Sequence, residues 1–399
     1  MARNNTYNIL MYSHDTYGLG HIRRTMAIAQ KLRGPNTNIL ILTGSPIAGR
    51  FTFPEKIDFV RIPGMIKKTN EEYQPLSIKI NPRHALDIRR NIITATAKTF
   101  NPHLFIVDKE PFGLKKEVLP TLKWLKRSSS HTQTVLGLRD VMDEAQVIKR
   151  DWMEKGVYLA LEELYDEIWV YGNQDLYNPV VEYNISDHIA RKIFFTGYIP
   201  RNIPDKKSVL KIRRDMGAGK SRHLVVVTTG GGGDGYAVID TYLSMFETKI
   251  LPMDPSHLKS VLITGPFMPK KERKKILKRA RILDIKAFHF FRQMEKLQAA
   301  ADMVVCMGGY NTICELLSQG TPCLVIPRET PRKEQLIRAQ ALKRRNLVDF
   351  LPWNKLSAAA MGQKVLSILE NPHPFYDAIS KFPLTGIDIM YRRIKQFIG

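Results

Sequence analysis

Long apolar runs are missing from this sequence of 399 residues. No uncharged stretch approaches the roughly 18–20 apolar residues that a membrane-spanning helix needs, so no transmembrane segment is predicted. Residues 1–5 lack the apolar core of a signal peptide and lead directly into a strand-like segment. We therefore expect a cytoplasmic protein whose access to a membrane, where it has one, is peripheral at the inner face.

Cysteine is scarce as well, with only Cys306, Cys314 and Cys323 in the whole chain. Their spacing matches no usual zinc-ligand pattern, and any disulfide between two of them would leave the third thiol over. We interpret the three residues as small buried apolar side chains of a reducing compartment. The sequence accordingly predicts no metal site.

Acidic residues are few: 38 Asp and Glu stand against 61 Lys and Arg, which gives a net charge of +23. This excess favours an anionic partner such as a nucleotide donor, lipid headgroups or nucleic acid, although it can also simply keep a soluble protein dispersed. The densest basic block, residues 270–281, is predicted to form one solvated helix. It carries no zinc-finger or RNA-recognition signature and no interleaved aromatic residues, so charge alone favours nucleic-acid binding.

The sequence does contain a regular alternation of strand-like and helix-like segments, and its length favours two domains over one core. Alternation of this kind predicts parallel βαβ units. Short apolar strands are expected at residues 8–12, 38–42, 104–107, 167–171, 224–228, 260–264, 303–306 and 323–326.

A polar segment that contains prolines, residues 200–207, interrupts the alternation. We therefore predict two open, doubly wound α/β domains, residues 1–203 and 204–399, with the last helix able to pack back on the first domain. Ligands of such sheets bind at the carboxyl ends of the strands, and two such halves facing each other would form a cleft.

The first motif, residues 13–24, joins the first strand to the first helix. Gly18 and Gly20 permit a tight turn and the close approach of a ligand. His21 falls at the start of the helix, where the helix dipole lowers the pKa of an imidazole and favours the neutral form that a general base requires. The alternative is a histidine that only caps the helix.

The second motif, residues 228–236, follows the first strand of the second half and opens a helix. The N–H groups of Gly231, Gly232 and Gly233 can surround a phosphate at the positive end of that helix. The alternative is a flexible turn. A P-loop is excluded because no Gly-Lys-Ser/Thr follows.

The third motif, residues 307–342, supplies a second strand-to-helix turn. Gly309, Asn311 and Thr312 stand at the start of the helix and form a second candidate anion site. Glu315 lies about one turn further, where a carboxylate can accept hydrogen bonds from both hydroxyls of a ribose. The alternative for Glu315 is an ordinary glutamate favoured by the helix dipole.

At this third motif the chain resembles glycosyltransferases of families 28 and 1, including the MurG-like N-acetylglucosaminyltransferases and a group of predicted glycosyltransferases. The segment from Gly18 to His21 is also similar to the Gly-x-Gly-His segment near the start of those families. Glu334 and Arg338 depart from the pattern, because Asp and Asn are usual there. The residues that match it are Gly309, Thr312, Glu315, Gly320, Pro322, Pro327, Gln335, Ala339 and Leu342.

The resemblance implies the GT-B fold, with two Rossmann-like domains facing across a cleft and a nucleotide-sugar donor, such as a UDP-sugar, held mainly by the second. It implies transfer of a hexosyl or N-acetylhexosaminyl group to an acceptor hydroxyl, with inversion and with no metal or cofactor; no Asp-x-Asp motif is present. His21 would be the base and Asp108 the residue that orients it, although Asp108 can instead cap a loop. The implied donor-binding residues are Gly18, Gly20, Gly231, Gly232, Gly233, Gly309, Asn311, Thr312, Glu315, Glu334 and Gln335.

Two other functions remain open at this stage. A nucleotide-sugar 2-epimerase shares the GT-B fold but needs acid and base carboxylates, and a nucleic-acid-binding protein would rest on charge alone. For the transferase, the charge and the family favour a lipid-linked acceptor at an anionic membrane, with the block 270–281 as a rival docking site. The first-half residues proposed to meet that membrane are Arg61, Met65, Ile66, Lys67, Lys68, Leu76, Ile78, Lys79, Arg83, Arg89 and Arg90.

Overall fold

The computed structural model describes residues 6–15, 20–50, 52–67, 72–219, 221–248 and 257–398. The chain forms two compact domains, of which the first comprises residues 1–199 with 385–399 and the second residues 200–384. The boundary thus lies at 199/200 rather than at 203/204, and the C-terminal helix α16 (Gly386–Ile398) belongs to the first domain. The chain returns there because Gly386 N–H donates to the carbonyl of Tyr198 and the Thr385 hydroxyl donates to that of Thr196.

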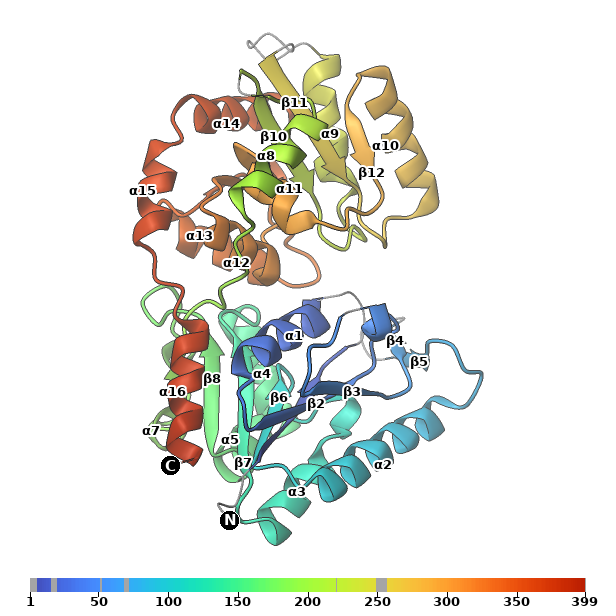
Figure 1. Cartoon of the computed structure of the whole chain (residues 1–399), viewed down its shortest axis with the longest axis vertical. Coiled ribbons are helices and arrows are strands. Elements are labelled where there is room, and N and C mark those ends of the chain that lie inside the picture. Colours follow the sequence, from blue (N-terminus) through green and yellow to red (C-terminus); the bar gives the residue numbers. More distant parts are fainter. Residues whose placement is uncertain are drawn as a thin grey trace. The chain divides into compact units, whose positions relative to one another are not determined.

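The first domain is built on a parallel sheet of seven strands in the order β3-β2-β1-β6-β7-β8-β9 (Figure 1). Its strands β1, β6 and β8 are almost entirely buried, as expected of a sheet covered by helices on both faces. The strands are β1 Tyr7–Ser13, β2 Thr37–Thr43, β3 Ile57–Arg61, β6 Leu104–Asp108, β7 Gln133–Arg139, β8 Glu167–Tyr171 and β9 Ile193–Phe195, with a separate antiparallel pair β4 Met65–Lys67 and β5 Tyr73–Pro75.

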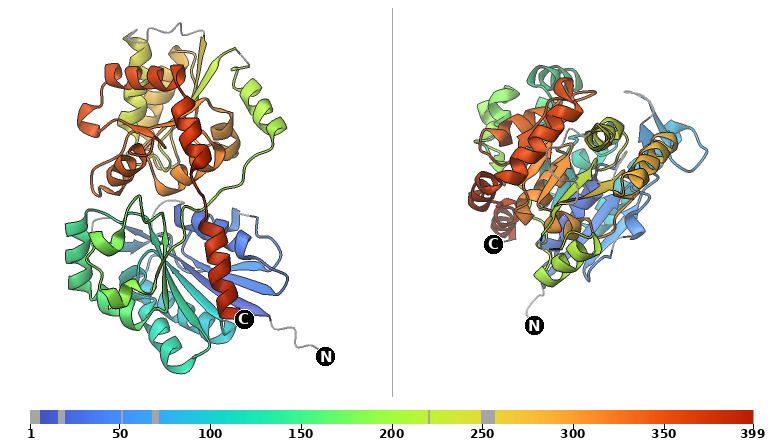
Figure 2. Two further views of the ribbon diagram at one scale, coloured as in Figure 1. Left: turned by 90° about the vertical axis from the view of Figure 1, so that its left-hand side faces the viewer. Right: turned by 90° about the horizontal axis from the view of Figure 1, so that it is seen from above.

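Helices cover both faces of this sheet because the chain winds outward from its middle in two directions. Right-handed crossovers then place α1 on one face and α2 to α5 on the other. Helix α16 packs beside α1 (Figure 2). The helices are α1 Gly20–Leu32, α2 Pro82–Phe100, α3 Leu119–Ser128, α4 Ala145–Lys155, α5 Val157–Glu163, α6 Pro179–Glu182 and α7 Asp187–Ala190.

The second domain repeats this design with a parallel sheet in the order β12-β11-β10-β13-β14-β15. Its strands are β10 His223–Thr228, β11 Leu258–Ile263, β12 Lys286–Phe288, β13 Met303–Cys306, β14 Cys323–Val325 and β15 Asp349–Phe350. Its helices are α8 Lys206–Asp215, α9 Tyr236–Glu247, α10 Lys270–Ile282, α11 Met294–Ala300, α12 Tyr310–Gln319, α13 Glu334–Lys343, α14 Ala358–Glu370 and α15 His373–Lys381. The predicted α/β class with two doubly wound domains is confirmed.

Each sheet has a topological switch point, where chain connections leave in opposite directions and a crevice opens at the carboxyl ends of the strands. In the first domain this point lies between β1 and β6, and in the second it lies between β10 and β13. All three predicted motifs begin at the carboxyl end of one of these strands. The fold therefore brings them to the places where α/β proteins bind ligands.

The basic block forms α10, whose side chains are largely exposed apart from Ile276 and Ala280. All three cysteines are buried thiols, as interpreted from the sequence. Among the described helices, none has the length and apolar composition that crossing a bilayer requires.

Candidate functional site

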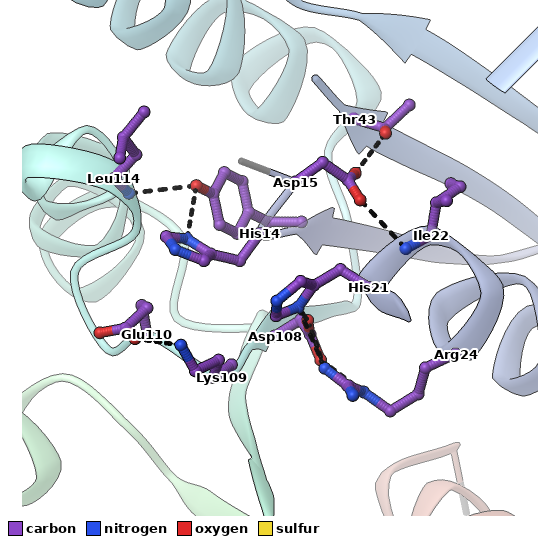
Figure 3. Close-up of polar contacts among 11 residues, drawn as sticks. His14, Asp15, His21, Ile22, Arg24, Thr43, Asp108, Lys109, Glu110 and Leu114 are labelled. Carbon is purple, nitrogen blue, oxygen red and sulfur yellow. Dashed lines mark hydrogen bonds and ion pairs between the residues drawn. The ribbon is translucent and has the colours of Figure 1, made fainter. Parts of the chain in front are cut away.

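His21 and Asp108 meet at the switch point of the first domain (Figure 3). The Nδ1 atom of His21 lies 2.5 Å from Oδ2 of Asp108, which is the last residue of β6. A third residue joins them: Arg24 donates from Nε to Oδ1 at 3.0 Å and from Nη2 to both carboxylate oxygens at 2.7 and 2.8 Å. Because His21 and Arg24 are three residues apart on α1, they present their side chains on one helix face.

The start of α1 is held against the sheet by Asp15, which follows β1. One carboxylate oxygen of Asp15 accepts the N–H of Ile22 at 3.0 Å, and the other accepts the hydroxyl of Thr43 at the end of β2. Side chains that bond the orphan N–H groups of a first turn fix where a helix begins. Asp15 therefore sets the position from which His21 reaches Asp108.

Electrostatics keeps this histidine neutral and this aspartate ionised. Burial lowers the pKa of His21 to about 4 and outweighs the opposing effect of Asp108, although 17% of the imidazole side chain remains exposed. Burial alone would raise the pKa of Asp108, but the charge of Arg24, together with His21, holds that pKa well below its usual range. An ionised carboxylate only accepts hydrogen bonds, so His21 must donate its Nδ1 proton to Asp108. The Nε2 atom is then the basic nitrogen.

Sequence reasoning missed Arg24 and a second histidine, His14. The rings of His14 and His21 are edge to face, with centroids 5.5 Å apart. Tyr12 lies behind His14: its hydroxyl donates to Glu117 at 2.6 Å and lies 3.4 Å from Nδ1 of His14. The signal for Arg24 was its place one helical turn after His21.

Arg89 is the partner of Glu117, and both side chains are fully buried. Its guanidinium donates twice to that carboxylate and once to the carbonyl of Pro63 at 2.6 Å. The sequence-based placement of Arg89 on a membrane-facing surface is therefore wrong, and Met65, which is 1% exposed, is excluded for the same reason. Lys68 lies outside the described residues.

In the second domain, the glycine-rich loop between β10 and α9 is a packed turn with two exposed corners. Gly232 has φ of +85°, and a Cβ there would lie 2.0 Å from the carbonyl oxygen of Thr264. The N–H groups of Gly232 and Gly235 bond within the loop, whereas Gly231 and Gly233 are exposed. Of the three predicted phosphate-binding glycines, Gly232 is thus required by the backbone conformation and close packing of the loop itself.

The turn between β13 and α12 is less tightly packed than the glycine-rich loop. A Cβ added at Gly309, which precedes the first residue of α12, would meet no atom within 4 Å. Asn311 and Thr312 follow in the first turn and are partly exposed. The side chain of Arg201, from the segment that leads into the second domain, donates to Oδ1 of Asn311 at 2.7 Å. A partly exposed helix N-terminus with a guanidinium beside it is suited to an anion.

Glu334 and Gln335 begin α13 and are both bonded to Arg328. Glu334 pairs with the guanidinium at 2.8 Å, and Oε1 of Gln335 accepts the backbone N–H of Arg328 at 3.0 Å. The same guanidinium reaches Asp234 in the glycine-rich loop at 3.0 Å. Arg328 thus ties the start of α13 to that loop, a connection that no local sequence pattern indicated.

Of the other candidate residues, one lies in α12 and one begins α1. Glu315 is buried in the second turn of α12, and Gly20 is the first residue of α1. Gly18 lies outside the described residues. Within the described part of the chain, no three His, Cys, Asp or Glu side chains converge as a metal site requires.

Comparison with known families matches residues 225–386 to the C-terminal domain of glycosyltransferase family 28. A curated relative, the UDP-N-acetylglucosamine–N-acetylmuramyl-(pentapeptide) pyrophosphoryl-undecaprenol N-acetylglucosamine transferase of Caldanaerobacter subterraneus subsp. tengcongensis, is 24% identical over 189 residues, or 46% of this chain and 50% of the relative. The transferase of the same name from Rickettsia massiliae is 24% identical over 168 residues, or 42% and 44%. The chain spans about half the length of the curated relatives it matches.

Solved structures match over nearly the whole chain. MurG of Acinetobacter baumannii has a TM-score of 0.61 at 11% identity and covers 98% of this chain and 99% of its own. UGT71G1 of Medicago truncatula, solved with UDP-glucose, has a TM-score of 0.64 at 12% identity and covers 100% and 99%. At such low identity these likenesses establish the fold alone.

Proposed function

We propose that this chain, which has the GT-B fold and whose residues 225–386 match the C-terminal domain of glycosyltransferase family 28, transfers a sugar from a nucleoside diphosphate donor to an acceptor hydroxyl. The observation that supports this most is the His21–Asp108 pair at the switch point of the first domain. In the neutral imidazole, Nε2 carries no proton and can accept one. An unprotonated base of this kind is what activation of a hydroxyl requires.

The reaction proposed is a single displacement at the anomeric carbon. The acceptor oxygen forms a bond to that carbon while its proton passes to Nε2 of His21. The bond from the anomeric carbon to the diphosphate oxygen breaks on the opposite face, and the nucleoside diphosphate leaves with the electron pair. The configuration at the carbon is therefore inverted.

The departing diphosphate is proposed to bind at the start of α12. The open space at Gly309 admits phosphate oxygens to the backbone N–H groups, and Arg201 supplies a positive charge beside them. Gly231 and Gly233, which are exposed in the loop after the neighbouring strand β10, are proposed to contact the same diphosphate through their backbone. The proposal assigns the ribose to Glu315, whose burial would strengthen a hydrogen bond to its carboxylate.

A product assay tests the activity directly. The purified chain is incubated with a panel of UDP-, GDP- and dTDP-sugars, with and without polyprenyl-diphosphate-linked acceptors, and the products are resolved by mass spectrometry and NMR. A new glycoside with inverted anomeric configuration is expected. An epimerised sugar formed from the donor alone would instead identify a 2-epimerase, and an unchanged panel would overturn both proposals.

We propose further that the acceptor is lipid-linked and that the first domain meets an anionic membrane. The curated relatives are named for a pyrophosphoryl-undecaprenol substrate, which is lipid-linked. In this chain, exposed aliphatic and basic side chains lie between β5 and α2, in the first two turns of α2 and on the short helical turn 114–116. We call them the α2 basic–aliphatic surface. Such a mixture suits an anionic interface. It consists of Leu76, Ile78, Lys79, Ile80, Arg83, Ile88, Lys115 and Lys116.

A further inference from the structure

The carboxylate of Asp108 is shared between His21 and a guanidinium that is almost completely buried. The side chain of Arg24 is 2% exposed and bonds both oxygens of Asp108. Its Nη2 atom also lies 3.1 Å from Nδ1 of His21. A positive charge thus lies beside the imidazole, at 3.1 Å, as well as the carboxylate at 2.5 Å (Figure 3).

Tyr171 and Gly137 hold the guanidinium of Arg24 next to Asp108. The guanidinium lies over the ring of Tyr171, 5.8 Å from the ring centre. That ring occupies the place of a missing side chain at Gly137, where a Cβ would lie 1.9 Å from the tyrosine oxygen. Gly137 is also the residue of β7 that pairs with Asp108 on β6. Because Gly137 has no side chain, it leaves space beside Asp108 for the ring of Tyr171, and that ring contacts Arg24.

We propose that Arg24 is a positioning residue: it neutralises Asp108 and thereby keeps His21 in the neutral form that accepts a proton from the acceptor. The role assigned to His21 rests on the proposed function, whereas the charge coupling among the three residues does not. A lone His–Asp pair favours the imidazolium, because the carboxylate stabilises a positive ring. Here the bidentate guanidinium offsets part of that stabilisation and adds to the effect of burial.

As a consequence, His21 should remain neutral, and able to act as a base, at mildly acidic pH. The charged or titratable groups around this cluster include His14 after β1, Lys109 and Glu110 after β6, Asp15 before α1, and Tyr171 of β8. Burial lowers the pKa of His21 to about 4, and the charges of Arg24 and Lys109 act in the same direction. Since activity requires neutral His21, it should persist as the pH falls until that pKa is reached. Without Arg24 the loss should begin at higher pH.

The test is a histidine NMR titration of the full chain, with the His21 signal assigned by its absence in H21Q. The wild-type signal should show His21 neutral at pH 5.5, and R24M should raise its pKa by more than one unit. R24K, which keeps a positive charge, should titrate within half a unit of the wild type. K31M removes an exposed charge from the same helix and should leave His21 unchanged.

His21 protonated at pH 6 in the wild type would overturn the proposal, and this measurement needs a variant only to assign the signal. Equal His21 pKa values in R24M and the wild type would overturn it as well. With an active donor and acceptor, kcat/KM of R24M should fall at least tenfold more than that of wild type between pH 8 and pH 5. A merely structural role would lower activity equally at both values. Failure to form any glycoside counts against the proposed function and leaves the titration result standing.

Discussion

Arg338 donates a hydrogen bond from Nη1 to the carbonyl oxygen of Gly308, 3.0 Å away, from a side chain that is 1% exposed. It links α13 to the turn that precedes α12, and its guanidinium lies 5.8 Å from the ring centre of Tyr310. The sequence comparison drew attention to this residue because an asparagine is usual at its position. In the structure it braces the turn proposed to receive the diphosphate.

We predict that Arg338→Met lowers both stability and nucleotide affinity. Loss of a charged hydrogen bond that leaves a buried carbonyl unsatisfied costs about 1.5–3 kcal/mol. Chemical denaturation should show that decrease, and calorimetry with UDP should show weaker binding because the start of α12 is less well held. Gln340→Ala, on the exposed side of the same helix, is the matched control and should change neither. Wild-type stability of Arg338→Met would contradict the bracing role.

Two glycine substitutions distinguish a packed turn from a ligand site. Gly232→Ala should destabilise the second domain strongly, because its φ is +85° and its Cβ would collide with Thr264. Gly309→Ala should leave stability within about 0.5 kcal/mol, as for an unhindered surface substitution, since its φ is negative and its Cβ meets open space. It should nonetheless weaken UDP binding by occupying the space that a phosphate needs. Unaltered UDP affinity in Gly309→Ala would place the diphosphate elsewhere.

Glu315→Ala should weaken nucleotide binding while the fold is retained. A lost hydrogen bond between a charged carboxylate and the ribose costs about 1.5–3 kcal/mol, or roughly 10- to 150-fold in the dissociation constant. Calorimetric titration with UDP measures this directly. Glu370→Gln removes an exposed negative charge from the same domain and serves as the control. Equal affinities in the two variants would remove Glu315 from the donor site.

His21→Ala should reduce turnover by roughly 10²–10⁴-fold, the usual range for loss of a general base. Nucleotide affinity should be nearly unchanged, since the donor is proposed to bind to the second domain. Initial rates at saturating donor, together with UDP calorimetry, separate the two effects. The control is His188→Ala, an exposed histidine of the same domain. A turnover within threefold of wild type would show that His21 is not the base.

Patterns local in sequence predicted the architecture well. The buried strands β1, β6, β10 and β13 are short apolar runs, and parallel pairing necessarily brings their carboxyl ends to one edge. That relation, with the family resemblance, was enough to name His21 and Asp108, which lie 87 residues apart. Strand β7, although buried, was not singled out, because Gly137 interrupts its apolar run.

Contacts between distant side chains could not be predicted in this way. Arg89 stands among basic neighbours and resembles a surface residue, but its partner Glu117 is 28 positions away, and only packing of α2 brings them together. Arg328 joins Asp234 across 94 positions. The bond from Arg24 to Asp108 depends on how α1 is rotated over the sheet, which Asp15 and Thr43 determine.

The chain should sediment with vesicles that contain anionic lipid at low salt, and it should not sediment with neutral vesicles. Basic side chains near an anionic surface contribute about 1 kcal/mol each, and salt screens that attraction over about 10 Å at 0.1 M. On the α2 basic–aliphatic surface, Lys79 and Arg83 are exposed and so are Ile78 and Ile80, which can enter the interface. The variant K79E/R83E should therefore lose most of the binding, and I78S/I80S should weaken it without altering charge.

Helix α10 is the matched control, because it presents a comparable charge on the other domain. Lys274 and Lys278 are exposed on it, and the variant K274E/K278E changes the net charge of the chain by the same amount as K79E/R83E. If total charge alone determined binding, the two variants would lose it equally. Binding through the first domain requires K79E/R83E to be the weaker of the two. The reverse order would move the docking surface to α10, and equal sedimentation of the wild type with neutral and anionic vesicles would reject an electrostatic membrane contact altogether.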